Sequence, residues 1–270
     1  MSTEATTTPS RWVSPVARAM CDLGLLTVRA LRRDTRMLDA LLVSIALPVM
    51  IMATFVYVFG GAIDTGVSGL AYIDFVVPAV ILLCAGYGAA TTAAAMAEDM
   101  AGGMIDRFRS LPLRDWAVPV SHVAASLGRN LAAAATALAA ALALGFRPDA
   151  TTSDWLLAVT VVGAYILAIS TIAVLWGLVV RSVQAAGALS FVVLFMPYIS
   201  DAFVPAESMP TGLRAFAEHQ PTTPLVQTLR ALLLDQPLGS AGALAAAWLL
   251  AGTALSVPLA ATLFRRRVRC

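Results

Sequence analysis

The residues whose types and spacing can do specific chemistry lie between positions 98 and 115. Apolar side chains recur there at the spacing that places them on one face of a helix: Met104, Ile105, Phe108 and Leu111. Arg107 and Arg109 take the opposite side, and Pro112 ends the run. The chemistry this pattern supports is noncovalent docking. We predict a short amphipathic helix whose apolar ridge binds either a partner protein or lipid headgroups.

Enzymatic chemistry finds little support in the sequence. His122 and His219 are the only histidines, and the topology derived below puts them on opposite sides of a membrane. Neither a His-Glu-x-x-His zinc motif nor a Gly-x-Ser-x-Gly nucleophile motif occurs. The three cysteines, Cys21, Cys84 and Cys270, share no short spacing typical of a metal site or a redox pair. We therefore expect no catalytic residue, metal site or cofactor in this chain.

All 18 basic residues are arginines, and the chain contains no lysine. A conventional phosphate-binding P-loop requires a lysine, so this chain is not a P-loop ATPase. If ATP drives its activity, another polypeptide must bind the ATP and magnesium. The net charge of +2 gives no reason to expect nucleic-acid binding.

The composition is that of an integral membrane protein. Hydrophobic residues make up 59% of the chain and charged residues 13%, whereas soluble proteins average about 25% charged. Mean hydropathy is +0.82. Apolar stretches follow one another through residues 40–264, most of them long enough to cross a bilayer, which takes about 20 residues. We predict an all-α polytopic fold with six transmembrane helices. The first, second, fourth and fifth cover residues 40–63, 75–97, 155–180 and 182–200. The third lies within residues 115–147 and the sixth within 235–265.

Residues 1–39 are predicted to form a tail and an interfacial helix. Four arginines follow the spacing of one helical stripe: Arg29, Arg32, Arg33 and Arg36. Leucines lie largely on the other sides of the helix. A basic face with an apolar back favours a helix in the plane of an anionic inner leaflet, the alternative being a solvated charged helix.

Arginines are distributed unevenly between the two sides of the membrane. With the N-terminus inside, the outer side holds only Arg147, Arg214 and Arg230, while the inner side includes the arginine-rich tail, residues 265–270. Positive charge collects on the cytoplasmic side of membrane proteins. We therefore expect a protein of the cell membrane with both termini in the cytoplasm.

The outer segment, residues 201–238, is long and rich in proline. One helix is predicted to begin near Pro210 and to end before Pro221. A second has Thr223 as N-cap and Pro224 as its first residue, and it ends in a run of leucines. Leucines at this density disfavour open water. We expect re-entrant half-helices that dip into the outer leaflet and are buried against protein.

Two of the predicted spans carry features that bear on transport. The span over residues 75–97 is rich in small residues, including Gly86 and Gly88, which let another helix approach closely. The span over residues 182–200 carries large side chains that either line a path for an apolar substrate or meet lipid and neighbouring helices: Phe191, Phe195, Met196 and Tyr198.

One arginine, Arg129, falls within a predicted span. Counting back from the outer end of that span places it near the inner edge, where it can snorkel to phosphates; a gating or substrate role is the alternative. No carboxylate is expected deep inside a span, since Asp74, Asp154 and Asp201 all lie at outer edges. An ion-driven carrier, which usually needs acids inside the membrane, is therefore disfavoured.

Two motifs resemble a known family. Residues 103–112, with the sequence GMIDRFRSLP, and residues 203–224 look like the type-2 permeases of ABC transporters, in particular the daunorubicin-resistance-type drug export permeases. The resemblance covers nearly the whole chain, from the predicted interfacial helix to the sixth span.

The resemblance implies a permease subunit of an ATP-driven ABC exporter that has no nucleotide-binding domain of its own. Residues 98–115 would be the coupling helix, seated in a groove of a cytoplasmic ABC ATPase through Met104, Ile105, Arg107, Phe108, Arg109 and Leu111. The interfacial helix would be the connecting helix, and the outer half-helices would cap the path. Two permeases, identical or related, and two ATPases would form the working unit, with the second and fifth spans at its centre.

The cargo implied by the resemblance is an amphipathic drug or antibiotic. A lipid-linked or polysaccharide cargo fits the same architecture. Two further hypotheses stay open on the residues alone: a membrane scaffold that recruits a partner through the amphipathic helix, and an ion-coupled carrier.

Overall fold

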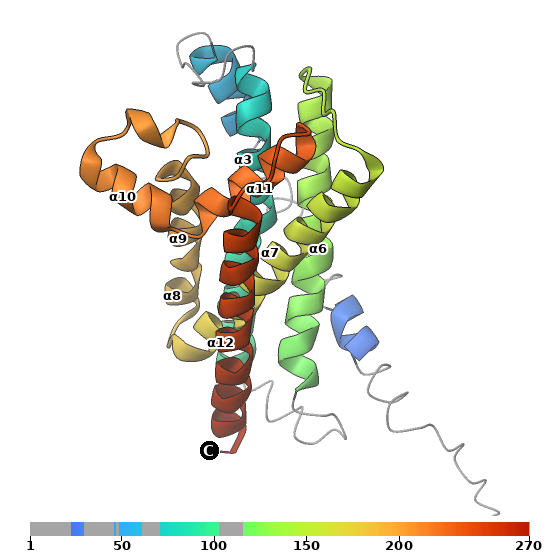
Figure 1. Cartoon of the computed structure of the whole chain (residues 1–270). Coiled ribbons are helices and arrows are strands. Elements are labelled where there is room, and N and C mark those ends of the chain that lie inside the picture. Colours follow the sequence, from blue (N-terminus) through green and yellow to red (C-terminus); the bar gives the residue numbers. More distant parts are fainter. Residues whose placement is uncertain (1–22, 30–45, 47–48, 61–70, 103–115, 270) are drawn as a thin grey trace, which may run out of the picture.

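The computed structural model describes residues 23–29, 46, 49–60, 71–102 and 116–269, and every regular element in these ranges is a helix (Figure 1). Four helices are long and apolar enough to cross a membrane: Tyr72–Ala101, Ala117–Ala143, Thr152–Val179 and Ala241–Arg267. Shorter apolar helices cover Val49–Val58 and Val183–Tyr198. The chain is therefore a polytopic, all-helical membrane protein, as predicted.

The predicted second span is two helices, α3 (Tyr72–Tyr87) and α4 (Ala89–Ala101), separated at Gly88. It runs four residues beyond the predicted end at position 97. The third and fourth predicted spans are α6 (Ala117–Ala143) and α7 (Thr152–Val179). The helix α7 begins at a capping box, in which Thr151 and Asp154 satisfy each other's backbone N–H groups. The predicted sixth span is α12 (Ala241–Arg269).

The predicted fifth span is also divided. It consists of α8 (Val183–Gly187) and α9 (Leu189–Tyr198), separated at Ala188. The Ser190 hydroxyl donates to the Gly187 carbonyl at 2.7 Å beside this break, so a side chain satisfies a backbone acceptor there. Hydropathy alone did not reveal the division.

The N-terminal part of the chain is described only in pieces. Residues 23–29 are helical, as predicted for the interfacial helix, and Leu26 packs against a cluster that includes Met96 and Phe264. Part of the predicted first span is present, including the π-helix η1 (Phe55–Phe59). The remaining residues of 1–39 and 40–63, including the arginine stripe beyond Arg29, lie outside the described residues.

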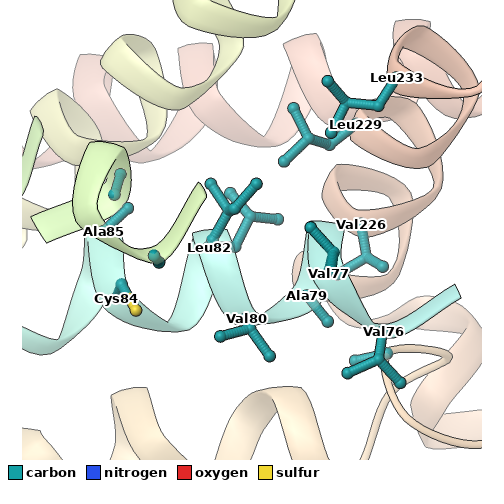
Figure 2. Packing of buried hydrophobic residues seen from close by; sticks show 14 of the residues in the cluster. Val76, Val77, Ala79, Val80, Leu82, Cys84, Ala85, Val226, Leu229 and Leu233 are labelled. Atoms are coloured by element: carbon teal, nitrogen blue, oxygen red, sulfur yellow. The ribbon is translucent and has the colours of Figure 1, made fainter. Parts of the chain in front are cut away.

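The helix α3 lies at the centre of the bundle. Its apolar side chains are buried on all sides, whereas α12 is exposed along most of its length. Figure 2 shows Val77 and Leu82 of α3 facing Val226 and Leu229 of α11 (Thr222–Leu233). A helix that is apolar all round belongs in a core. The second predicted span thus forms the interior on which the other helices pack.

The helix α6 contributes a face of small residues to the interior. Its buried residues are mostly alanine and serine, including Ala125, Ser126, Ala133, Ala134, Ala137 and Ala141. Small side chains let helix backbones approach closely in a membrane. This face packs against α3, α4 and α7.

The outer segment forms a 3-10 turn, η2 (Ala206–Ser208), and the helices α10 (Thr211–His219) and α11. The prediction of α10 is confirmed, but the predicted start of α11 is wrong. Pro221 takes the N-cap position, and the Thr223 hydroxyl donates to the Ala217 carbonyl instead of capping. Leu232 and Leu233 are buried against protein, as predicted. In Figure 1, α11 crosses the bundle beside α3 while α10 lies beyond α9.

Candidate functional site

One end of the bundle joins the helices that flank the predicted docking stretch; we call it the basal end. The helix α4 ends at Ala101 and α6 begins at Ala117, and Met96, Val118 and Phe264 pack in one cluster there. The exposed arginines at positions 265–267 follow directly. The predicted coupling residues themselves lie outside the described residues: Met104, Ile105, Arg107, Phe108, Arg109 and Leu111. The stretch that holds them therefore joins two packed helix ends at the basal end.

A buried acid–histidine pair ties these two helices together. Asp99 Oδ2 lies 2.9 Å from His122 Nε2, and both side chains are more than nine-tenths buried. The predicted end of the second span at position 97 is too early: α4 continues to Ala101 and buries Asp99 near its basal end. Within the described ranges, no group of three or more His, Cys, Asp or Glu side chains is placed to hold a metal ion.

The predicted path residues of α9 do not share one environment. Phe191 is 65% exposed and Phe195 is 54% exposed, and their i, i+4 spacing puts them on one face of the helix. Met196 is half-buried, and its carbonyl accepts a hydrogen bond from Gln220 at 3.1 Å. The structure brings Phe191 and Phe195 together on an open apolar surface of the single chain.

Tyr198 belongs to a packed aromatic cluster instead. Its ring stacks on Phe203 at 4.9 Å between centroids, and Phe203 stacks on Phe55 at 4.5 Å. The Tyr72 hydroxyl donates to the Phe203 carbonyl at 3.0 Å. Stacked rings and this buried hydrogen bond join η1, α3 and the end of α9. Phe195, 6.4 Å from Tyr198, connects the cluster to the open face of α9.

A buried arginine fastens α11 to its neighbours. The Arg230 guanidinium donates to the Phe75 carbonyl at 3.2 Å and the Asp201 carbonyl at 2.9 Å. It also lies 3.3 Å from Asp201 Oδ2 and 3.7 Å from the centre of the Phe75 ring. Gln227 donates to the same carboxylate at 2.9 Å. We call Arg230, Asp201 and Phe75 the outer clasp, because they join α11 to α3 and to the segment after α9.

The helix α10 contrasts with α11. Leu213 and Phe216 are each about half exposed, and Arg214 donates to Glu218 at 2.7 Å on the open surface. The hydrogen bond to Glu218, aided by charge attraction, raises the pKa of Arg214. α10 therefore offers an amphipathic surface while α11 is fully engaged in packing.

An apolar cavity of about 150 Å³ lies between α3, α6, α7 and α11. Ile81, Leu138, Trp155, Val162 and Leu229 are among its lining residues. Specific ligand sites combine apolar walls with a few placed polar groups. The apolar lining of this cavity supplies no polar anchor, so the α9 face is the better candidate for cargo contact.

Arg129 lies in a different position from the one predicted. Since α6 begins at Ala117 and ends at Ala143, Arg129 is near its middle rather than near its inner edge. Its side chain is half-buried and donates to the Gly88 carbonyl and the Thr92 hydroxyl. Its guanidinium is thus bonded to the second span inside the bundle.

Sequence reasoning missed Asp99, His122 and Arg230 as interacting groups. Asp99 is separated from Met96 and Thr92 by three and seven residues, so continuing the helical period of the second span places it on the buried face. Opposite charges at Asp201 and Arg230 within an apolar segment were the signal for the outer clasp. The partner Phe75, far away in the sequence, carried no such signal.

Comparisons with known proteins agree with this architecture. The family model described as ABC-2 type transporter matches residues 22–234. The chain is also similar to the daunorubicin resistance ABC transporter permease protein DrrB1 of Streptomyces coeruleorubidus, with 27% identity over 190 residues. The match covers 70% of this chain and 66% of that protein, just under two thirds of its length. The chain belongs to the ABC-2 type transporter family.

Proposed function

We propose that this chain is the membrane-spanning permease of an ABC exporter that moves an amphipathic, drug-like molecule out of the cell. The observation that carries the proposal is the family match over residues 22–234, which includes the basal stretch and the outer helices. The name of the similar DrrB1 protein supports a drug as cargo.

The motor of the proposed exporter is a separate cytoplasmic ABC ATPase that binds ATP and magnesium. A chain without lysine has no conventional P-loop, so it needs such a partner. The ATPase docks on the coupling stretch at the basal end. The arginines at positions 265–267 are exposed beside it, which supports a cytoplasmic location for this end and for both termini.

The proposed cargo path runs between two permeases, each contributing its α9 face. Phe191 and Phe195 offer apolar, polarisable surface that suits a molecule with an aromatic or aliphatic body. The outer clasp holds α11 over the end of this path. In the ATP cycle, closure of the ATPases moves the coupling stretch and shifts the permeases from an inward-open to an outward-open state.

The test is copurification followed by a transport assay. The tagged chain is purified in mild detergent together with ATPases encoded in the same genome, and the complex is placed in liposomes with daunorubicin as probe. Phe108→Ala should lower ATPase recovery and ATP-dependent daunorubicin movement at least tenfold, because the apolar ridge loses its largest side chain. Phe216→Ala, at the exposed surface of α10, is the matched control and should behave as wild type.

Two outcomes would contradict the proposal. Normal transport by Phe108→Ala at normal expression would remove the coupling role of this stretch. Transport that ignores ATP but collapses on adding a protonophore would favour an ion-coupled carrier, for which the buried Asp99–His122 pair is the supporting observation. Copurification without any transport would favour the scaffold hypothesis.

A further inference from the structure

The break in the second span lies in the most buried of the four long helices. α3 ends at Tyr87, and the Gly88 N–H turns back to the Gly86 carbonyl rather than continuing the helical ladder. Backbone groups freed by such a break need partners, because the bilayer interior offers no water. The Gly88 carbonyl accepts the Thr92 backbone N–H at 3.3 Å, the first hydrogen bond of α4, and three side chains also donate to it: Thr91 Oγ1 at 2.7 Å, Thr92 Oγ1 at 3.2 Å and Arg129 Nη2 at 3.0 Å.

Arg129 is the donor that joins α6 to the junction of α3 and α4, because Gly88 is both the C-cap of α3 and the N-cap of α4. The same Nη2 that donates to the carbonyl of Gly88 also donates to Thr92 Oγ1, in the first turn of α4, at 2.8 Å. One guanidinium therefore holds the Gly88 junction and the first turn of α4 against α6.

The surrounding residues leave no room for a side chain at Gly88 or Gly86. A Cβ atom added to Gly88 would lie 1.9 Å from Asn130 Oδ1, and one added to Gly86 would lie 2.4 Å from the Tyr165 hydroxyl. α6 and α7 thus press directly against the backbone of the break, as the prediction of a small-residue packing face requires.

Arg129 is itself carried on a rigid support. Asn130 Nδ2 donates to Ser126 Oγ at 3.1 Å, and Ser170 Oγ of α7 donates to the same oxygen at 2.8 Å. All three side chains are at most 1% exposed. A fully bonded, buried polar network fixes the helices that carry it. α6 and α7 therefore act as one frame beside the break.

The two halves of the span lead to different parts of the molecule. α4 packs on α7, α8 and α9, and it leads directly into the coupling stretch. α3 contacts α9 and α11, which carry the open aromatic face and the outer clasp. Movement applied at the basal end reaches α4 first. It passes to α9 through the buried cluster that α4 and α9 share, and to α11 and the outer clasp through α3, across the break.

We propose that Arg129 is a positioning residue for transport, which fastens the Gly88 junction of α3 and α4 to α6 and so keeps the two helices aligned while the coupling stretch moves. This inference rests on the proposed exporter function. In this role Arg129 binds neither cargo nor ATP. The role also explains why an arginine, whose charge is energetically unfavourable within a membrane, lies near the middle of α6.

The test compares transport with ATP hydrolysis in the reconstituted complex with its ATPase, with daunorubicin as probe. Arg129→Gln should keep ATP hydrolysis within about twofold of wild type and lower the daunorubicin moved per ATP at least tenfold. Arg129→Lys, which keeps the charge and one donor direction, should recover part of this ratio. Arg147→Gln is the control, because Arg147 also donates to backbone carbonyls, at Leu142 in the last turn of α6 and at Phe146 just after it, but away from the break.

A milder pair of variants decides the question if Arg129→Gln fails to fold. Thr91 and Thr92 both donate to Gly88, but only Thr92 accepts from Arg129. Thr92→Val should lower the transport-to-ATP ratio about threefold, and Thr91→Val should leave it unchanged. Equal ratios in all variants would overturn the proposal, as would a loss of ATP hydrolysis in parallel with transport.

Amide hydrogen exchange in detergent separates this inference from the proposed function. Arg129→Gln should speed exchange at residues 88–92 at least tenfold, while α12 stays unchanged. If the wild-type chain moves no daunorubicin, the exporter proposal fails, yet faster exchange at the break still supports the role of Arg129 in holding it. Unchanged exchange at residues 88–92 would overturn that role whatever the transport result.

Discussion

At the scale of single residues, the buried polar groups of this chain are held by several partners at once. Arg230 makes contacts with two carbonyls, one carboxylate and one aromatic ring. A buried charge is tolerated only when hydrogen bonds and opposite charge replace water. Each such group therefore fixes the helices that supply its partners.

Removing Arg230 should loosen the outer segment. Arg230→Met leaves the Asp201 carboxylate with Gln227 as its described partner and should lower the free energy of unfolding by about 3 kcal/mol. Thermal unfolding in detergent, followed by tryptophan fluorescence, measures the change. Arg214→Met, which breaks an exposed pair on α10, should leave the melting temperature nearly unchanged. Equal effects of both variants would show that the outer clasp adds no stability.

The sequence identified some of these charged residues but not their partners. Arg129 was noticeable because an arginine is rare inside an apolar span. Its partner at Gly88 was not, since every residue carries a backbone carbonyl and the sequence does not say which carbonyl lies beside Arg129. The contact depends on tertiary structure, and residue types alone do not contain it.

At the scale of elements, close helix contacts set the architecture. Gly177 of α7 meets α4 so tightly that an added Cβ would lie 2.5 Å from the Ala93 carbonyl and 2.9 Å from Met96 Cβ. Ala93, Ala97 and Ala173 are buried in the same contact region. The α4–α7 pair therefore depends on small residues from both helices.

Enlarging Gly177 should separate these helices. Gly177→Val forces backbone movement at the contact, and we expect a loss of about 2 kcal/mol in the free energy of unfolding. Denaturation in mixed micelles gives the measurement. Gly163→Ala is the matched control on the same helix, because an added Cβ there meets nothing within 4 Å. A Gly177→Val protein as stable as Gly163→Ala would contradict the tight contact.

Hydropathy predicted the long helices well and their interruptions poorly. α6, α7 and α12 lie where apolar stretches indicated them, because a bilayer-spanning helix needs a long apolar run. The breaks at Gly88 and Ala188 were not predicted, because one residue hardly changes the mean hydropathy of a span. The coupling residues near Phe108 lie outside the described residues and stay a prediction.

At the scale of the whole molecule, the open face of α9 is the surface we expect a second permease to cover. Phe191, Val192 and Phe195 are each more than half exposed in the single chain. The interior of a membrane offers no hydrophobic gain for pairing, so helix packing must supply the association. The aromatic residues on this face provide a large packing surface.

A cysteine on this face should link two copies. In a chain with Cys21, Cys84 and Cys270 changed to serine, Phe191→Cys should give a disulfide-linked dimer within minutes of mild oxidation. Leu156→Cys on α7, where the residue is 71% exposed, is the control and should stay monomeric. Gel electrophoresis without reductant separates the two forms. Equal linking at both positions would indicate random collision.

The small residues on the inner face of α6 have a consequence for how this protein can vary. On α12, Leu250 and Leu255 are exposed, whereas Ala245 and Ser256 are buried. The buried side chains are therefore no more apolar than the exposed ones, but they are smaller. Natural drift should therefore exchange leucine, phenylalanine and valine freely on the lipid side, yet reject a single added methyl group at positions such as Ala137.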